Sequence, residues 1–232
     1  MKKFLLLVFS FLSVCGAALA EVHPYHLDFN EFHELKVIDG INVDYICDKS
    51  KAGRIEFEAD SSVASAVIFT PGKGKLTINL AVRDSAYRNL PTIRVYSSFL
   101  SSVKNEGDST VRVMTPAPCP KFQAKLIGNG RLIVRDLEAT EVSAEIISGH
   151  GTMVLSGTVT MAKLNVTGAG DIQADNLKSR EGSATVTGTG AISCYVTEKL
   201  SVGGLGSGKI SYREKPEIKK KFLSKVKLIP LD

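Results

Sequence analysis

The stretch LNVTGAGDIQA, residues 164–174, places a Gly-Ala-Gly between two segments in which apolar and polar residues alternate. A Gly-x-Gly loop that binds phosphate needs further glycines and a helix that begins at once. Here Asp171-Ile172-Gln173-Ala174 resumes the alternation that is typical of a β-strand. The stretch therefore predicts a strand, a corner and a second strand, with glycines that turn the backbone rather than bind a ligand.

The same unit recurs through the second half of the chain. The copies are Gly128-Asn129-Gly130, Gly149-His150-Gly151, Gly168-Ala169-Gly170, Gly188-Thr189-Gly190 and Gly206-Ser207-Gly208. Successive copies are 21, 19, 20 and 18 residues apart, and a degenerate copy, Gly107-Asp108-Ser109, lies 21 residues before the first. A repeat of this length is the sequence signature of a solenoid.

The residues that flank each corner repeat with period 2. Two residues after each glycine pair stand Leu132, Met153, Ile172, Ile192 and Ile210, and four residues after it Val134, Leu155, Ala174, Cys194 and Tyr212. Two residues before the pair stand Leu126, Ile147, Val166 and Val186. This pattern predicts an all-β, right-handed parallel β-helix with rungs of about 20 residues, whose equivalent side chains stack into interior columns. Glycine suits corners that need positive φ or lie too close to the next rung for a Cβ.

An antiparallel β-sandwich or barrel with glycine hairpins is the alternative fold, and it predicts turn signals about every 8 to 12 residues. Residues 29–100 are also rich in strand patterns, but their spacing is irregular. We favour an extension of the solenoid there over a separately packed sheet. Regular Gly-x-Gly rungs are expected over 101–213, and a basic tail or cap over 214–232.

The N-terminus, MKKFLLLVFSFLSVCGAALA, sets two lysines before an apolar run and ends on Ala18-Leu19-Ala20. This pattern predicts a cleaved secretory signal over residues 1–20. A retained membrane span and a lipoprotein anchored at Cys15 are the alternatives. We expect export to the periplasm, the cell surface or the medium, with residues 21–28 flexible at the mature N-terminus.

The 232 residues are 44% apolar, which is ample for a packed core, and carry a formal charge of +5 that falls to +3 without Lys2 and Lys3. That balance does not predict nucleic-acid binding. The one basic run, Lys219-Lys220-Lys221 with Lys225 and Lys227, is predicted to be a solvated tail, with contact to a polyanion or an anionic membrane as the alternative. The three cysteines of the mature chain, Cys47, Cys119 and Cys194, lack metal-type spacing, and whether Cys47 pairs with Cys119 stays open.

The chain resembles, over roughly residues 29–232, the bacterial family of putative auto-transporter adhesins with a head GIN domain. The similar residues are Phe32, Val37, Gly40-Ile41-Asn42-Val43, Gly74-Lys75-Leu76-Thr77-Ile78, the Gly-x-Gly array, and Tyr212 with Pro216-Glu217. The chain departs from the family where Asn, His, Ala and Thr replace the serine between glycines, and where no glycine precedes Pro216. The resemblance implies a secreted or surface β-helical protein and no catalytic residues.

An enzyme on a β-helix would need a pair of carboxylates about 5 to 10 Å apart. The candidates in the array are Asp136, Glu138, Glu141, Glu145, Asp171, Asp175, Glu181 and Glu198, which do not recur in one column. Glu145 takes a place filled in other rungs by Ala124, Leu164, Ala184 and Leu200, and we expect it to tilt toward solvent. Asp171, the acid directly after a glycine pair, is expected to cap a turn.

The remaining reactive side chains predict no site. The spacing of His23 and His26 could clip a metal ion, but the pair lies in the segment expected to be flexible, His33 has no such partner, and His150 sits in a corner that should face water. Cys194 shares an interior column, which predicts a buried, inert thiol. We therefore assign no catalytic, metal-binding or cofactor-binding residue and expect no cofactor.

The outward residues of two rungs suggest a different function. Lys163, Asn165 and Thr167 on one rung, and Thr185 and Thr187 on the next, should form flat rows of amine, amide and hydroxyl groups. Such a surface suits a non-enzymatic adhesion module that binds a glycan or a surface or matrix protein, with peripheral membrane contact or none. Equally, these residues could serve only to keep the outer face hydrated, and the sequence does not separate the two interpretations. A carbohydrate-active enzyme and a structural envelope protein that forms homo-oligomers are the alternatives.

Overall fold

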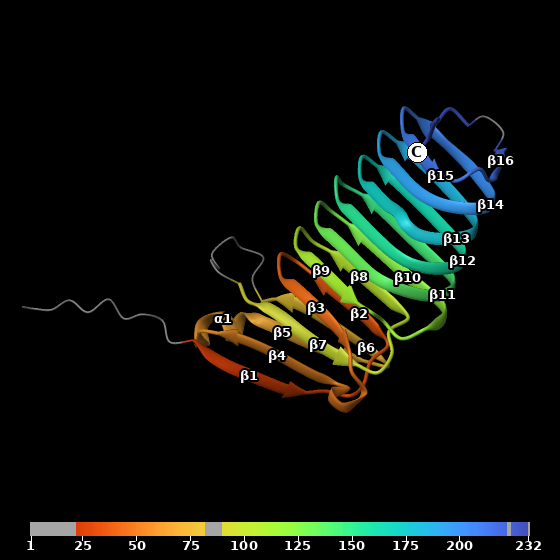
Figure 1. Ribbon diagram of the computed structural model, residues 1–232. Helices are drawn as coiled ribbons and strands as arrows, with labels where there is room; N and C mark the ends of the chain where they lie inside the picture. Colours follow the sequence, from red (N-terminus) through yellow and green to blue (C-terminus); the bar gives the residue numbers. More distant parts are fainter. Residues whose placement is uncertain (1–21, 82–89, 222–223, 232) are drawn as a thin grey trace, which may run out of the picture.

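The computed structural model describes residues 22–81, 90–221 and 224–231, which form one 17-stranded sheet wound into a parallel β-solenoid of about 6 turns. The rungs stack along one axis, with the N-terminal strands at one end and the C-terminal strands at the other (Figure 1). The predicted all-β solenoid is confirmed. The expected signal peptide and Cys15 lie outside the described residues. Within the described ranges, no helix has the length and apolar character that a membrane crossing requires.

Each regular turn of the solenoid is built mainly of one strand that ends at a Gly-x-Gly corner. These strands are β10 (Cys119–Ile127), β11 (Arg131–Ser148), β12 (Thr152–Gly168), β13 (Asp171–Gly188) and β14 (Ala191–Gly206). Each pairs in parallel with the next. Alternate residues of each strand point inward. Equivalent inward residues of successive strands lie opposite one another and so form apolar columns through the stack.

Two interior columns lie where the repeat predicts them. Leu132, Met153, Ile172, Ile192 and Ile210 lie opposite one another in successive strands, and all are buried. In the second column Cys194 lies between Ala174 and Tyr212, and Tyr212 is half-buried at the last regular rung. Burying one aliphatic side chain stabilises the fold by about 1.5 to 3 kcal/mol, so these columns hold much of the stability.

The column before the corners needs one correction. Leu126 lies opposite Ile146, and Ile146 lies opposite Val166, whereas the Ile147 that we placed there is 36% exposed. The ladder shifts register after Leu126, because this rung holds one residue more and bulges. The same shift in register explains why Glu145 does not lie in the interior column.

Glu145 lies on the outer face, opposite Lys125 and Asn165. Ala144 takes the interior place between Ala124 and Leu164 that the simple count gave to Glu145. The expectation that Glu145 faces solvent is therefore confirmed, although no glutamate occupies an interior column there.

The two glycines of a corner serve different purposes. Gly188, the first of its pair, has a φ of +124°, which L-residues with a side chain rarely adopt. Gly190, the second, lies so close to the rung below that a Cβ there would be 2.3 Å from the carbonyl oxygen of Gly170. The N–H of Gly190 also donates to the carbonyl of Gly168 at 3.1 Å, so the corner backbones bond to one another along the rod.

The parallel stack continues into the N-terminal part, but chain order and spatial order differ there. The strands are β2 (Glu34–Ile38), β3 (Asn42–Cys47), β6 (Lys75–Leu80), β7 (Thr92–Ser97), β8 (Ser102–Glu106) and β9 (Thr110–Met114). β2 pairs in parallel with both β6 and β8, and β3 with both β7 and β9. The first rung in sequence is thus inserted between two later ones.

Antiparallel strands close the N-terminal end of the rod. These are β1 (His23–Asp28), β4 (Arg54–Ala59) and β5 (Val67–Gly72), with the short helices η1 (Lys49–Lys51) and α1 (Ser61–Ala66) between them. The expectation of a flexible segment over 21–28 is wrong for residues 23–28, which form β1 and pair with β4. The rings of Tyr25 and Phe57 stack with centroids 5.1 Å apart, so apolar packing holds the segment in place.

The C-terminal residues add a last, incomplete turn. β15 (Lys209–Arg213) pairs with β14, and β16 (Glu217–Lys220) and β17 (Lys227–Pro230) add parallel strands to β14 and β15. Lys219 and Lys220 therefore belong to a strand rather than to a loose tail, although their side chains are exposed as expected. Lysines on an edge strand discourage its pairing with other chains.

The column assignment predicts an asymmetry between two neighbouring substitutions on β13. Val186→Asp buries an unpaired charge in a fully buried position and should lower the free energy of unfolding by at least about 3 kcal/mol. Thr187→Asp, one residue on and exposed, should change it by less than about 0.5 kcal/mol. Urea unfolding measures both, and equal losses would contradict the assignment.

Corner crowding makes a second prediction. Gly190→Ala places a Cβ against the backbone of the next rung and should cost more than about 2 kcal/mol of unfolding free energy. Gly40→Ala is the matched control, because a Cβ at Gly40 would meet nothing within 4 Å. Thermal and urea unfolding of both variants test this prediction, which fails if Gly190→Ala is as stable as Gly40→Ala.

Candidate functional site

The outward residues on the last third of β12, β13 and β14 form straight rows that we call the polar face. Its members are Lys163, Asn165, Thr167, Ser183, Thr185, Thr187 and Ser201. Lys163 lies opposite Ser183, Asn165 opposite Thr185, and Thr167 opposite Thr187. The rows that the sequence predicts are therefore in register, and parallel pairing spaces them about 4.8 Å apart along the rod.

Nearer the N-terminus the same face carries paired charges instead of hydroxyl groups. Lys36 Nζ lies 2.8 Å from Glu106 Oε2, and Lys125 Nζ lies 3.2 Å from Glu145 Oε2. Glu141 accepts from Lys121 at 3.1 Å and from Lys163 at 2.6 Å. Hydrogen bonds from these two lysines hold the pKa of Glu141 below its usual value. Glu141 and Glu145 thus join neighbouring rungs as ion pairs.

A groove of about 330 Å³ lies at the C-terminal side of the polar face. Its lining comprises Met161, Lys163, Glu181, Gly182, Ser183, Lys199, Leu200, Ser201, Glu217 and Lys219. Sequence reasoning missed Ser183, Lys199 and Ser201 as site residues, and it named Lys219 only within the basic run for which polyanion contact was the alternative. Counting forward in steps of one rung from Ser183 would have found Ser201, whereas the pairing of β16 with β14 that brings Lys219 alongside has no signal in the repeat.

Most of the other candidate carboxylates are dispersed. Arg213 donates to Asp175 at 3.3 Å, and Arg180 lies 3.1 Å from Glu198 and 3.9 Å from Glu181. Asp136 accepts a hydrogen bond from Thr115 on the preceding rung, and Glu138 is exposed. The structure brings Glu181 and Glu198 together on the Arg180 guanidinium, where they neutralise its charge, and leaves Asp136, Glu138 and Asp175 apart from them.

Asp108 and Asn129 cap the corners, rather than Asp171 as the sequence predicted. The carboxylate of Asp108 accepts from the backbone N–H of Asn129 at 3.1 Å, and the amide oxygen of Asn129 accepts from the N–H of His150 at 3.1 Å. Among the described residues, no hydrogen bond involves the exposed side chain of Asp171. His150 faces solvent, as expected.

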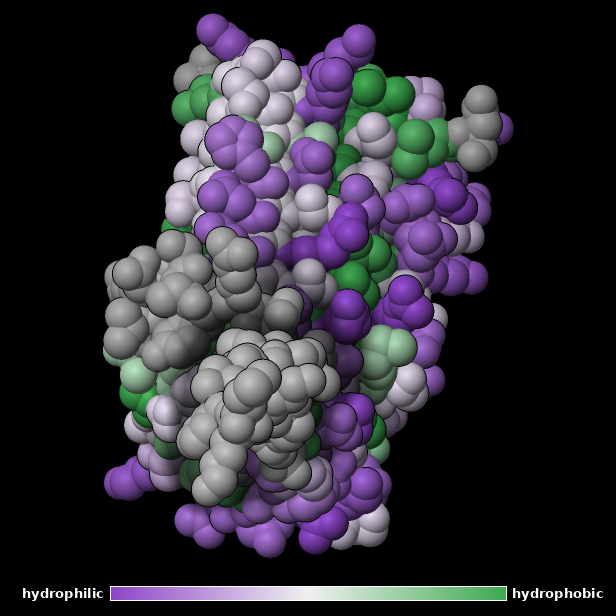
Figure 2. Space-filling model, turned by 90° about the vertical axis from the view of Figure 1, so that its left-hand side faces the viewer, coloured by the Kyte–Doolittle hydropathy of each residue, from purple (hydrophilic) through white to green (hydrophobic). Residues whose placement is uncertain are grey.

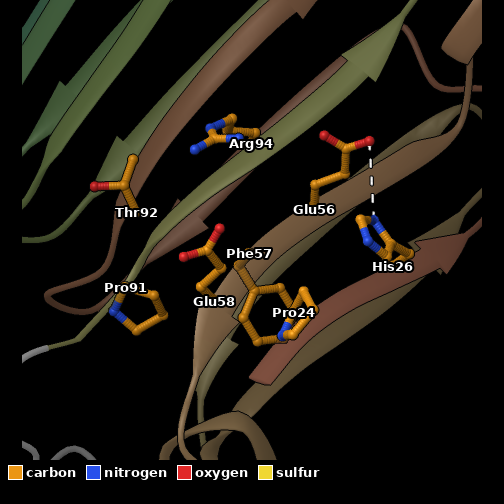
Figure 3. Close-up of a pocket in the computed structure, with 8 residues that line it drawn as sticks. All are labelled: Pro24, His26, Glu56, Phe57, Glu58, Pro91, Thr92 and Arg94. Carbon is orange, nitrogen blue, oxygen red and sulfur yellow. Dashed lines mark ion pairs between the residues drawn. The ribbon is translucent and has the colours of Figure 1, made fainter. Parts of the chain in front are cut away.

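A second pocket, of about 230 Å³, lies between β1, β4 and β7 (Figure 3). Two acids, Glu56 and Glu58, line it. Tyr96 Oη donates to Glu56 Oε2 at 2.9 Å, and this bond is the first cause of a lowered Glu56 pKa, with Lys51 and His26 adding to it. His26 Nδ1 lies 3.9 Å from Glu56 Oε1. A carboxylate held in its charged form is unsuited to act as a general acid.

The histidines and cysteines form no cluster. His23 and His26 lie three residues apart on β1 and so point to opposite faces of the strand, which prevents them from clipping one ion together. Within the ranges that the structure covers, no three His, Cys, Asp or Glu side chains lie close enough to hold a metal ion. Cys47, Cys119 and Cys194 are free thiols, so Cys47 and Cys119 do not pair. Burial raises the pKa of Cys194 to about 12, which agrees with the inert thiol predicted from its column.

Seen from one side, the rod shows a mostly hydrophilic surface on which hydrophobic residues form small separate islands (Figure 2).

The family model described as "Putative auto-transporter adhesin, head GIN domain" matches residues 31–216. The chain belongs to this family. No curated protein matches its sequence significantly.

Solved structures share the fold of this head GIN domain at low sequence identity. A putative adhesin from Bacteroides fragilis is 19% identical, with a TM-score of 0.79 over 91% of this chain and 97% of that one. A putative lipid binding protein from Parabacteroides distasonis is 19% identical, with a TM-score of 0.72 over 91% and 97% of the two chains. A putative adhesin from Parabacteroides merdae, at 18% identity, gives 0.67 over the same shares.

The stretch Gly40-Ile41-Asn42, which we call the GIN stretch, forms a corner of the head GIN domain. Asp39, just before it, has a φ of +69°, and its carboxylate accepts from the N–H of Leu80 at 3.1 Å. The amide oxygen of Asn42 accepts from the N–H of Thr110 at 2.9 Å. The two side chains therefore tie the inserted rung to its neighbours on both sides.

The burial of the thiols makes a prediction about their reactivity. Iodoacetamide reacts with thiolates, so at pH 8 the half-buried Cys47 should be alkylated in the native protein while Cys194, with its raised pKa, stays unmodified. Denaturant at pH 8 should make Cys194 react, because unfolding both exposes the thiol and removes the burial that raises its pKa. Peptide mass spectrometry reads the result, and equal native rates for both thiols at pH 8 would contradict the burial of Cys194.

Proposed function

We propose that this chain is a non-enzymatic binding module, exported to the cell surface or beyond, whose polar face contacts a glycan or a surface or matrix protein. The observation that carries the proposal is the alignment of amide and hydroxyl groups on two consecutive rungs, with Ser201 extending one row onto a third. The corner-locked backbone fixes these groups before any ligand arrives. A rigid row therefore loses little conformational entropy on binding, and many weak hydrogen bonds add up along it.

The distribution of carboxylates supports a binding role over the enzymatic alternative. A glycosidase needs one carboxyl group with a raised pKa as general acid beside a second carboxylate. Among the described residues, each carboxyl group with a shifted pKa has it lowered, mostly by hydrogen bonds from serine, tyrosine or lysine. The acids of the array instead pair with lysine and arginine on neighbouring rungs.

Two further observations support export. The family and two of its structural neighbours carry the description of putative adhesins, proteins that act outside the cytoplasm. Residues 1–20 have the charged start, apolar run and small-residue end of a secretory signal.

Binding of residues 21–232 to a panel of glycans and matrix proteins, with released fragments measured alongside, tests the proposal. We expect retention without cleavage. Asn165→Ala/Thr185→Ala should weaken the retained interaction by about tenfold or more, because each lost hydrogen bond is worth about 1 kcal/mol.

Thr152→Ala/Gln173→Ala is the matched control, since it removes similar groups from another outer face of the same two strands. It should leave binding unchanged. Released fragments, or an equal loss in both double variants, would contradict the proposal. The absence of any retained ligand would favour the structural envelope role.

A further inference from the structure

The C-terminal end of the rod carries an excess of uncompensated positive charge. Residues 209–231 hold eight basic and two acidic residues, a local formal charge of +6 beside +5 for the whole chain. Within the described part of the chain, none of the lysines in this segment lies within ion-pair distance of a carboxylate. On the same face nearer the N-terminus, by contrast, five lysines each form an ion pair with a glutamate. They are Lys36, Lys104, Lys121, Lys125 and Lys163.

Part of this charge borders the groove described above. Lys199 and Lys219 line the groove without an ion pair, although Glu217 lies opposite Lys199 in the ladder. Ser201 lies opposite Lys219 in the same ladder. The groove therefore offers two ammonium donors on neighbouring strands, offset by two residues along the ladder, with the Ser201 hydroxyl group beside Lys219.

Lys221 extends the basic border onto the polar face. Its Nζ donates to Thr185 Oγ1 at 3.4 Å, so the side chain lies across the strand between them. Gly203 makes room for it, because a Cβ there would lie 2.7 Å from Cδ of Lys221. The lysine border and the rows of the polar face are thus one continuous surface.

The rest of the groove has the composition of a sugar site. The half-buried Met161 supplies apolar surface, on which the C–H face of a pyranose ring can pack, while Leu200 lies buried beneath it. Ser183, Glu181 and Glu217 supply hydrogen-bond acceptors for sugar hydroxyl groups. The rung spacing of about 4.8 Å is close to the length of one sugar residue in an extended chain, so successive residues can meet successive rungs.

We propose that the groove at the C-terminal end binds an acidic polysaccharide, with the carboxylate or sulfate groups on Lys199, Lys219 and Lys221 and the chain running along the rod onto the polar face. This assignment rests on the proposed binding function and names its ligand class. The lysine ammonium groups recognise the acidic substituents by charge-assisted hydrogen bonds. The apolar groove surface and the aligned hydroxyl groups distinguish a sugar chain from other polyanions.

Titration of residues 21–232 with alginate, a carboxylate-bearing polysaccharide, and with dextran sulfate tests the proposal, with uncharged dextran as the neutral probe. We expect both acidic polymers to bind, more weakly as salt rises, and dextran to bind far less. Lys199→Gln/Lys219→Gln should lower the alginate affinity by at least about tenfold. Lys199→Arg/Lys219→Arg should retain it.

Lys49→Gln/Lys73→Gln, which removes the same charge from exposed positions at the far end of the rod, is the control and should change affinity by less than about twofold. An equal loss in both Gln pairs would overturn the proposal, because binding would then depend on net charge alone. Tighter binding of a poly-dT oligonucleotide or of phosphatidylglycerol vesicles than of alginate would also overturn it. If acidic polymers fail while another ligand still binds through Asn165 and Thr185, this inference fails and the proposed function stands.

Discussion

The structure depends on the crowding of backbones at the Gly-x-Gly corners. At each corner the second glycine lies against the carbonyl groups of the rung below, at a distance that admits no Cβ. The first glycine takes a positive φ that turns the chain into the next strand. Because the corner N–H groups bond to the corner carbonyls of the preceding rung, one rung cannot slide relative to the next without breaking several contacts at once.

This fixed register is what gives the surface its order. A slip of one residue would exchange the interior and exterior of a strand, so a register that protects the aliphatic columns also aligns the outward side chains. The same ladder therefore yields ion pairs where lysine and glutamate alternate, as at Lys121, Glu141 and Lys163, and uncharged rows where threonine and asparagine follow one another. The register that the core imposes therefore also orders the proposed binding surface.

The repeat made the second half of the fold predictable, because corner spacing and alternation are local in sequence. Ile147 and Glu145 were misplaced in their columns because one extra residue bulges in that rung. The 21-residue interval between the corners shows that this residue is present, but not where in the rung it lies. The insertion of β2 and β3 between later rungs could not be predicted, since strand patterns alone do not choose among distant partners. The polar face was predicted from the repeat, whereas Lys219 and Lys221 joined it through a strand outside the repeat.

Hydrogen–deuterium exchange with and without alginate tests most directly the claim that the ordered outer face is the binding surface. The account predicts slower amide exchange in 199–203 and 217–221, extending to 163–167 and 183–187, with the rest of the rod unchanged. Slower exchange confined to the pocket around Glu56 and Arg94, or spread evenly over the rod, would contradict the account.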